Sequence, residues 1–209
     1  MTKQHQALLA QSLSGLLHPL LMPVYLAAVM LFMPAFAPML PVKFRWLILG
    51  IVAYCFMLVP VLILFILTRM GKIKSIHLEE RADRFLPLFL ITISYIVGLR
   101  LMAAFHAPGT LVLLMRGVTM AILLVAIISV FWKISAHTTA IGGAFGITLL
   151  LSMMFNIDLT VEAIIMVLLG GILAWSRLYL NRHSISQVNY GFMLGFSAIT
   201  ISFLLHAWL

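Results

Sequence analysis

The stretch Ser176–Gln187 combines residue types that are suited to phosphate chemistry. It reads Ser-Arg-Leu-Tyr-Leu-Asn-Arg-His-Ser-Ile-Ser-Gln and separates two apolar segments. Arg177 lies six positions before His183, and Gln187 lies four positions after it. If a helix begins at His183, Gln187 shares its face and can reach the imidazole. An arginine, a histidine and an orienting hydrogen-bond partner at a membrane boundary indicate a site that handles phosphate.

Two other loops hold most of the remaining polar chemistry. The first contains Lys74 and Arg81, which are seven positions apart and would project from one face of a helix. The second contains Ser135 and His137 directly before an apolar segment, where Ser135 is a suitable N-cap. A helix N-terminus carries free N–H groups and partial positive charge, which favours a bound phosphate. Loops of this kind can form one site if they share a membrane face.

The composition indicates a membrane protein whose helices would position these loops. The chain is 64% hydrophobic and 9% charged, with a mean hydropathy of +1.19. Several apolar runs reach the roughly 20 residues that a helix needs to cross a bilayer. We expect one all-α domain, residues 1–209, folded as a polytopic bundle of six to seven transmembrane helices. The expected spans are about 13–36, 45–69, 86–105, 110–132, 138–156, 161–178 and 188–208, which place the three polar loops on one face.

The charge balance limits the classes of partner. Thirteen Lys and Arg against five Asp and Glu give a net charge of +8. Anionic lipid headgroups and membrane topology explain this excess, and so does an anionic substrate. Nucleic acid is excluded as a partner, because the basic residues are scattered over loops between spans. A single cysteine, Cys55, excludes an internal disulfide.

Two short patterns concern the first span and the last three spans. Ala35-Phe36-Ala37 resembles a signal-peptidase site, but the apolar stretch before it is too long and too interrupted by proline, so we expect an uncleaved first span. Glycines gather in the last three spans, and Gly191 and Gly195 form a small-xxx-small pattern that predicts close helix packing. A homo-oligomer is compatible with these features.

The three loops together resemble the signature motifs of the type 2 phosphatidic acid phosphatase family. The family pattern is Lys-x6-Arg-Pro, then Pro-Ser-Gly-His, then Ser-Arg-x5-His-x3-Asp. The matching segments have the same order and internal spacing and cover about half of the chain: Lys74-x6-Arg81, Ser135-x-His137 and Ser176-Arg177-x5-His183-x3-Gln187.

Four positions depart from the family pattern. Ala82 and Ile134 stand where the family has proline, Ala136 where it has glycine, and Gln187 where it has the aspartate that orients the histidine. The amide of Gln187 can still accept an N–H from His183, but it cannot stabilise an imidazolium as a carboxylate would. The missing charge could come from an acidic residue of the first loop: Glu79, Glu80 or Asp83.

The resemblance implies a metal-independent enzyme without a cofactor. His183 would attack phosphorus to form a phosphohistidine, and His137 would protonate the leaving oxygen. The phosphoryl oxygens would be held by Lys74, Arg81, Ser135, Ser176 and Arg177. The substrate would be a lipid phosphate whose tails stay in the bilayer: phosphatidate, phosphatidylglycerol phosphate, a polyprenyl pyrophosphate or a phosphorylated lipid A.

Three other classes of function use the same residues. A lipid-phosphate-binding protein or complex subunit without turnover is compatible with Gln187. Measuring phosphate release would distinguish such a binder from a phosphatase. A metal-dependent enzyme would need ligands among His77, Glu79, Glu80, Asp83, His137 and His183. However, the segment His77-x-Glu79-Glu80 lacks the second histidine, four positions away, that helical zinc sites have. A transporter would place ionisable groups near the membrane midplane, whereas here they gather at one face.

The membrane orientation is predicted differently by two arguments. Basic residues are more frequent on the face of the three loops, so the positive-inside rule places that face in the cytoplasm. The resemblance instead implies a bacterial inner-membrane protein whose site faces the periplasm. Some of these basic residues would bind the substrate, so their number is a poor guide to membrane topology. We therefore follow the resemblance and expect the periplasmic orientation.

Overall fold

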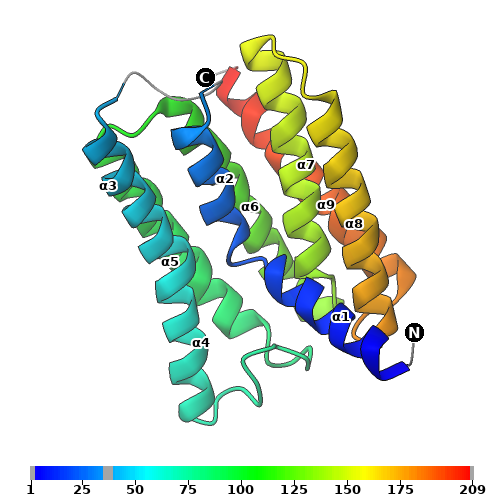
Figure 1. The fold of residues 1–209 in the computed structure, drawn as a ribbon. Helices are drawn as coiled ribbons and strands as arrows, with labels where there is room; N and C mark the ends of the chain where they lie inside the picture. The colour runs from blue at the N-terminus through cyan, green and yellow to red at the C-terminus, as the bar shows by residue number, and fades with distance from the viewer. Residues whose placement is uncertain (1–2, 35–39, 208–209) are drawn as a thin grey trace.

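The computed structural model describes residues 3–34 and 40–207, and within these ranges it contains helices and no strand (Figure 1). The Ala35–Ala37 triplet lies outside the described residues. The helices are α1 (Lys3–Leu16), α2 (Met22–Phe32), α3 (Val42–Ala53), α4 (Val59–Arg69), α5 (Phe85–Ala104), α6 (Gly109–Phe131), α7 (Ala136–Phe155), α8 (Thr160–Tyr179) and α9 (Ile185–Ala207). A π-helical turn, Tyr54–Leu58, joins α3 and α4 into one continuous helix. The predicted all-α class is confirmed.

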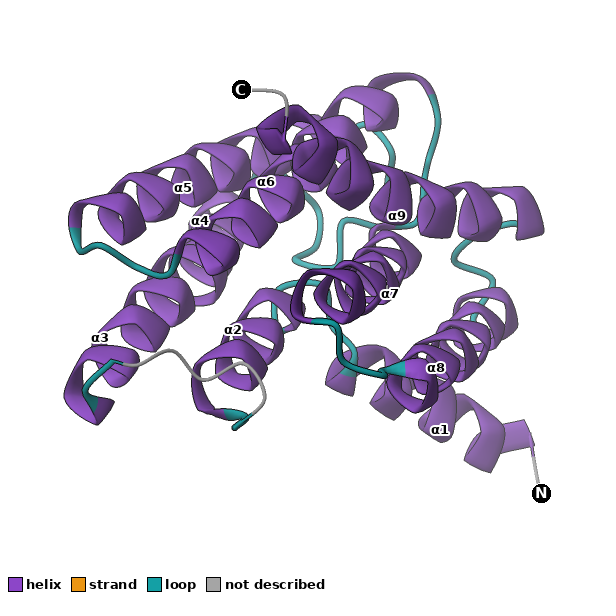
Figure 2. Cartoon of the chain, turned by 90° about the horizontal axis from the view of Figure 1, so that it is seen from above, coloured by secondary structure: helices purple, strands orange, loops and turns teal. Residues whose placement is uncertain are grey.

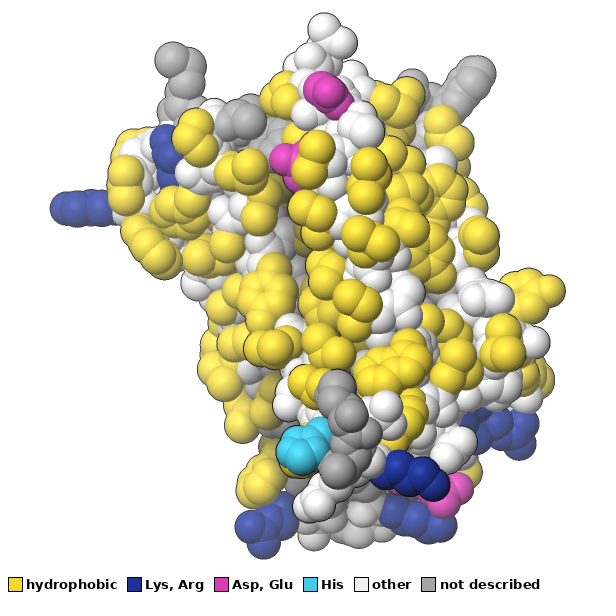
Figure 3. Space-filling view, turned by 45° about the vertical axis from the view of Figure 1, so that its right-hand side comes forward, with side chains coloured by type: hydrophobic (Ala, Val, Ile, Leu, Met, Phe, Trp, Pro, Cys, Tyr) yellow, Lys and Arg dark blue, Asp and Glu magenta, His cyan; other side chains and the backbone are white. Residues whose placement is uncertain are grey.

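Six helices are long and apolar enough to cross a membrane. They are the α3–α4 helix and the helices α5 to α9. Apolar side chains cover the middle of the molecule, and most Lys and Arg side chains lie towards its ends (Figure 3). Together these features indicate an integral membrane protein, as the composition predicted.

The predicted first span, 13–36, is wrong as a continuous helix. The chain turns at His18 and Pro19, between α1 and α2. Proline cannot donate a backbone hydrogen bond and clashes with the preceding turn of a helix, while Nδ1 of His18 accepts the N–H of Leu20 at 3.3 Å and closes the turn. The 11 residues of α2 span about 16 Å, roughly half of a typical hydrocarbon core.

The glycines of α7 and α9 allow these two helices to pack backbone against backbone. A Cβ atom built on Gly195 would overlap the carbonyl oxygen of Thr139, and one built on Gly142 would overlap the carbonyl oxygen of Phe192. The predicted close packing at Gly191 and Gly195 is therefore confirmed. This contact fixes the start of α9 beside the start of α7, which brings the second and third polar loops together.

Replacing Gly195 with alanine is expected to destabilise the protein. The added methyl group must displace the backbone of α7, and overpacking of this kind costs about 1–3 kcal/mol. Thermal unfolding in detergent measures the effect. Gly171→Ala in α8 is the matched control, because a Cβ there meets nothing within 4 Å and alanine in a helix interior gains roughly 0.5–1 kcal/mol. Equal unfolding midpoints for the two variants would contradict this account of the α7–α9 contact.

The overall arrangement leaves one end of the bundle for the polar loops. Seen from above, α7, α8 and α9 lie on one side, α3 to α6 lie on the other, and α2 lies between them (Figure 2). α1 crosses the ends of α7 and α8 at the same end of the bundle as the three loops (Figure 1).

Candidate active site

Hydrogen bonds and an ion pair join the three polar loops, which are far apart in the sequence. Arg84 donates from Nη1 to the carbonyl oxygen of Ile134 at 2.7 Å, which ties the first loop to the second. The N–H of Ser135 donates to the carbonyl oxygen of Gln187 at 3.3 Å, which ties the second to the third. An ion pair between Glu79 and Arg182 ties the first to the third. The loops therefore form one continuous structure at this end of the bundle.

A cavity of about 710 Å³ opens beneath the joined loops. One end is polar and is lined by residues from all three loops: Arg84, Lys133, His137, Arg177, Arg182 and His183. The other end extends between the spans and is apolar. Six helices line it, with residues that include Leu26, Leu64, Leu88, Ile122, Ala144 and Ile199. The cavity thus joins a cationic region at the bundle end to an apolar region inside it.

The surroundings of His183 determine its tautomer. Nδ1 lies 3.1 Å from Oε1 of Gln187 and 3.2 Å from the carbonyl oxygen of Lys133. Oε1 of Gln187 also accepts the N–H of Ser184 at 3.2 Å, which fixes the orientation of the amide. Both partners of Nδ1 are acceptors, so Nδ1 carries the proton and Nε2 of the neutral ring carries a free lone pair.

Burial keeps the His183 ring neutral. Burial, followed by the charges of Arg84 and Arg177, lowers the pKa of His183 from 6.5 to about 4, while its hydrogen bond to Gln187 opposes this shift. At pH 7 the ring is therefore an unprotonated base with an available Nε2. The acidic residues of the first loop have other partners: Glu79 pairs with Arg182, Glu80 lies 3.7 Å from Lys74, and Asp83 accepts the N–H of Lys74.

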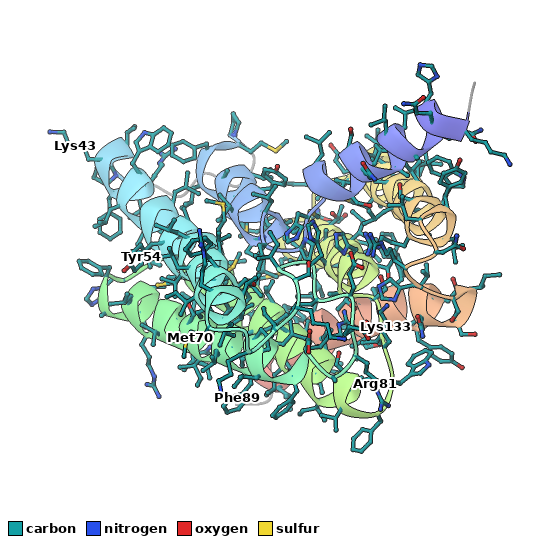
Figure 4. All side chains as sticks on the ribbon, turned by 90° about the horizontal axis from the view of Figure 1, so that it is seen from below. Lys43, Tyr54, Met70, Arg81, Phe89 and Lys133 are labelled. Carbon is teal, nitrogen blue, oxygen red and sulfur yellow. The ribbon has the colours of Figure 1, made fainter. Side chains whose placement is uncertain are left out.

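The first loop does not bring its predicted residues to the cavity. Lys74 is exposed and lies on the outside of the loop. Arg81 is also exposed and donates to the carbonyl oxygen of Phe131 at 2.7 Å. Viewed from the site end, Arg81 lies towards the rim of the molecule and Lys133 lies nearer its middle (Figure 4). The seven-residue spacing of Lys74 and Arg81 places them on one face only in a helix, whereas residues 70–84 form successive turns.

Arg84 is a site residue that the sequence motifs do not include. It lines the cavity, is only 5% exposed and lies directly before α5. Burial, followed by the charge of Arg177, lowers its pKa to about 10, so it remains positively charged at pH 7. The sequence signal that could have identified Arg84 is its position immediately before a span. It follows His77, which also lines the cavity, by seven residues.

The two predicted serines have structural positions outside the cavity lining. Ser135 is fully buried, and its hydroxyl accepts the N–H of Thr138 at 3.4 Å as the predicted N-cap of α7. The hydroxyls of Thr138 and Thr139 donate back to the carbonyl oxygen of Ser135, so they are not free to donate to a ligand. Ser176 is also fully buried, and none of the described residues hydrogen-bonds to its hydroxyl.

Arg177 and His137 complete the polar end of the cavity. Arg177 comes from the last turn of α8 and donates from Nη1 to the hydroxyl of Ser14 at 3.4 Å. His137 comes from the first turn of α7, and a hydrogen bond links it to the backbone of Ser14. The Nε atoms of Arg84 and Arg177 are buried and have no hydrogen-bond partner among residues 3–34 and 40–207. Two guanidinium groups with unused donors therefore border a cavity that four histidines also line: His18, His77, His137 and His183.

No group of three or more His, Cys, Asp or Glu side chains in the described part of the chain is arranged to hold a metal ion. The chemistry available from the residues themselves is that of cations, histidines and an amide. Comparison with known proteins found no matching family model, curated protein or solved structure.

Proposed function

We propose that this protein is a membrane lipid phosphatase that uses His183 as its nucleophile. The observation that carries the proposal is the pair of acceptors on Nδ1 of His183, Gln187 and the Lys133 carbonyl, because they leave the lone pair of Nε2 for attack on phosphorus. An oriented, neutral imidazole beside several cations is the arrangement that phosphoryl transfer to histidine requires.

The electrostatics of the cavity favour an anionic ligand. Arg84, Lys133 and Arg177 line its polar end, and the nearby carboxylate of Glu79 is paired with Arg182. Clustered cations repel one another, and the buried Nε donors of Arg84 and Arg177 have no hydrogen-bond partner in the part of the chain that the structure describes, which is costly in the absence of a ligand. A phosphate group would accept these donors and neutralise the excess charge.

The proposed reaction follows from the positions of the two histidines. Nε2 of His183 forms a bond to phosphorus while the bond from phosphorus to the lipid oxygen breaks. His137, which the negative charge of the bound phosphate would keep protonated, gives its proton to that oxygen. Water then attacks the phosphohistidine, gives a proton back to His137 and releases phosphate. Arg84 and Arg177 would bind the phosphoryl oxygens throughout, since this chemistry depends mainly on positioning and positive charge.

The apolar end of the cavity supports a lipid as the carrier of the phosphate. It runs between six helices from the level of the histidines into the bundle. Val61 and Phe65 of α4 line this end and are also 47% and 50% exposed, so the cavity borders the lipid-facing surface. A lipid tail could therefore remain among apolar side chains while its headgroup reaches His183. The substrates that we consider are phosphatidate, phosphatidylglycerol phosphate, a polyprenyl pyrophosphate and a phosphorylated lipid A.

Phosphate release from this panel tests the proposal. The purified protein is reconstituted in vesicles that contain each lipid, and free phosphate is measured with and without orthovanadate. We expect release from at least one lipid and inhibition by orthovanadate. His183→Ala protein, prepared in parallel, measures contaminating phosphatase. Equal release by the two preparations on every lipid would overturn the proposal.

One observation favours a second function, which is lipid-phosphate binding without turnover. Gln187 is neutral, so it cannot stabilise the positive charge that develops on His183 during attack. A pure binder would bind lipid phosphate through Arg84 and Arg177 and would show saturable binding with no release of phosphate. The same panel, assayed for binding and for release, distinguishes the two functions.

The resemblance to periplasm-facing relatives leads us to propose the same orientation, in a bacterial inner membrane. Four basic residues on the site face line the cavity and so serve the ligand: Arg84, Lys133, Arg177 and Arg182. Without these four residues, the site face has a smaller excess of basic residues, so the positive-inside rule gives less support to a cytoplasmic site. The opposite end of the bundle carries Lys43, Arg45, Arg100 and Arg116. A cysteine placed at the exposed Lys72, with Cys55 changed to serine, should react with an impermeant maleimide in cells whose inner membrane is intact. Reaction only after lysis would show that the site faces the cytoplasm.

A further inference from the structure

His18 is a histidine of the polar end that no predicted motif contains. It lies in the turn between α1 and α2 and lines the cavity. Its ring centroid is 5.3 Å from that of His137, and the two ring planes meet at 81°, an edge-to-face arrangement. Aromatic rings at this distance and angle attract each other, and the contact restricts the rotation of both side chains.

The turn itself fixes the orientation of His18. Because Nδ1 accepts the N–H of Leu20, the proton of the neutral ring lies on Nε2. Burial, followed by the charges of His77 and Arg177, lowers the pKa of His18 to about 4, so the ring is neutral at pH 7. His18 is therefore held by the backbone on one side and contacts His137 on the other.

The end of α1 reinforces this contact. Ser14 hydrogen-bonds to His137 through its backbone and to Arg177 through its hydroxyl. At the other end of α1, the hydroxyl of Tyr179 in α8 lies 3.1 Å from the carbonyl oxygen of Lys3. α1 is thus attached to α8 at one end and contacts two cavity residues at the other.

We infer that His18 is a positioning residue for His137 and that the α1–α2 turn is a fourth segment of the site. The inference rests on the proposed function, because it assigns His18 the task of holding the proton donor of that reaction. His18 does not touch the reacting atoms. Its ring keeps the His137 imidazole aimed at the position of the leaving oxygen, so its loss should reduce turnover more than substrate binding.

Two substitutions separate the ring of His18 from its role in the turn. The side-chain oxygen of asparagine accepts an N–H two residues ahead, so His18→Asn preserves the bond from Leu20 and removes the ring. His18→Phe keeps a ring against His137. His5→Asn is the control, since His5 is exposed near the start of the same helix. Thermal unfolding in detergent confirms that each variant is folded.

Steady-state phosphate release gives the first readout. For His18→Asn we expect kcat to fall about 10- to 100-fold, the range seen when outer partners of functional histidines are removed, and KM to change less than about threefold. His18→Phe should retain most of kcat, and His5→Asn should match the wild type. A kcat for His18→Asn within about threefold of wild type, or an equal loss in His18→Phe, would overturn the inference.

Nitrogen NMR of the histidine rings gives a second readout that does not depend on turnover. The His137 signals and their titration should differ between wild type and His18→Asn and should be unchanged in His5→Asn. Identical His137 signals in all three proteins would overturn the inference. If the wild type releases no phosphate, the proposed function fails, and the NMR comparison still decides whether His18 positions His137.

Discussion

Replacing His183 with alanine is expected to lower phosphate release by at least about 10³-fold, the scale of loss when a covalent nucleophile is removed. Substrate affinity should remain, because Arg84 and Arg177 still line the cavity. The measurement is kcat and KM for phosphate release, together with binding of the same lipid to the inactive protein. A His183→Ala variant with more than a tenth of wild-type kcat would exclude this residue as the nucleophile.

Gln187 provides a matched pair of substitutions that test how His183 is oriented. Gln187→Glu has nearly the same shape, still accepts from His183 and Ser184, and adds a negative charge beside the imidazole. The charge stabilises the cation that forms during attack. A nearby opposite charge shifts a pKa by about 1–3 units, and we expect part of this stabilisation to appear in the transition state as a rise in kcat of about 3- to 10-fold. Gln187→Leu removes the acceptor and leaves only the Lys133 carbonyl on Nδ1, so kcat should fall about 10- to 100-fold.

The opposite order of the two Gln187 variants would show that the amide does not act as the orienter of His183. Both proteins must first be shown to fold, because the carbonyl of Gln187 accepts the N–H of Ser135 and joins two loops. That bond uses the backbone, so neither side-chain substitution removes it. The pair therefore reports on the histidine rather than on the connection between the loops.

The sequence predicts the elements that depend on long apolar runs. Six spans follow from hydropathy because a membrane helix needs about 20 apolar residues and little else. The close approach of α7 and α9 follows from the spacing of Gly191 and Gly195, since glycine is the residue that permits such contacts. Gln187 lies beside His183, as their four-residue spacing predicts, although α9 begins at Ile185 and His183 precedes the helix.

Features that depend on loop conformation could not be predicted in the same way. The first loop forms turns instead of a helix, because Leu78 has a positive φ of 50° and the buried Ile73 packs into the core of the helix bundle. The site also includes His18 and Ser14, which precede the first motif by about 60 residues and reach the cavity only through the packing of α1 on α8. No local pattern contains that contact.

The choice between Arg81 and Arg84 gives the second large prediction. Arg84→Met should lower kcat/KM for phosphate release by about 10²- to 10³-fold, somewhat below the 10³–10⁵ attributed to arginines that stabilise phosphoryl transfer. Arg81→Met should change it less than about threefold, because Arg81 is exposed and its bond to the Phe131 carbonyl only closes the end of α6. The seven-residue spacing in the sequence predicts the reverse order.

Loss of Arg84 also removes the donor to the Ile134 carbonyl, which could unfold the loops and imitate a catalytic effect. Arg84→Lys addresses this, because it keeps the positive charge and a donor but lacks the guanidinium fork that binds phosphate oxygens in pairs. We expect this variant to unfold at nearly the wild-type temperature and still to lose at least about tenfold in kcat/KM. If the Arg81 variant is the impaired one while both Arg84 variants remain active, the phosphate is bound at the rim of the loop and the cavity beneath it has another use.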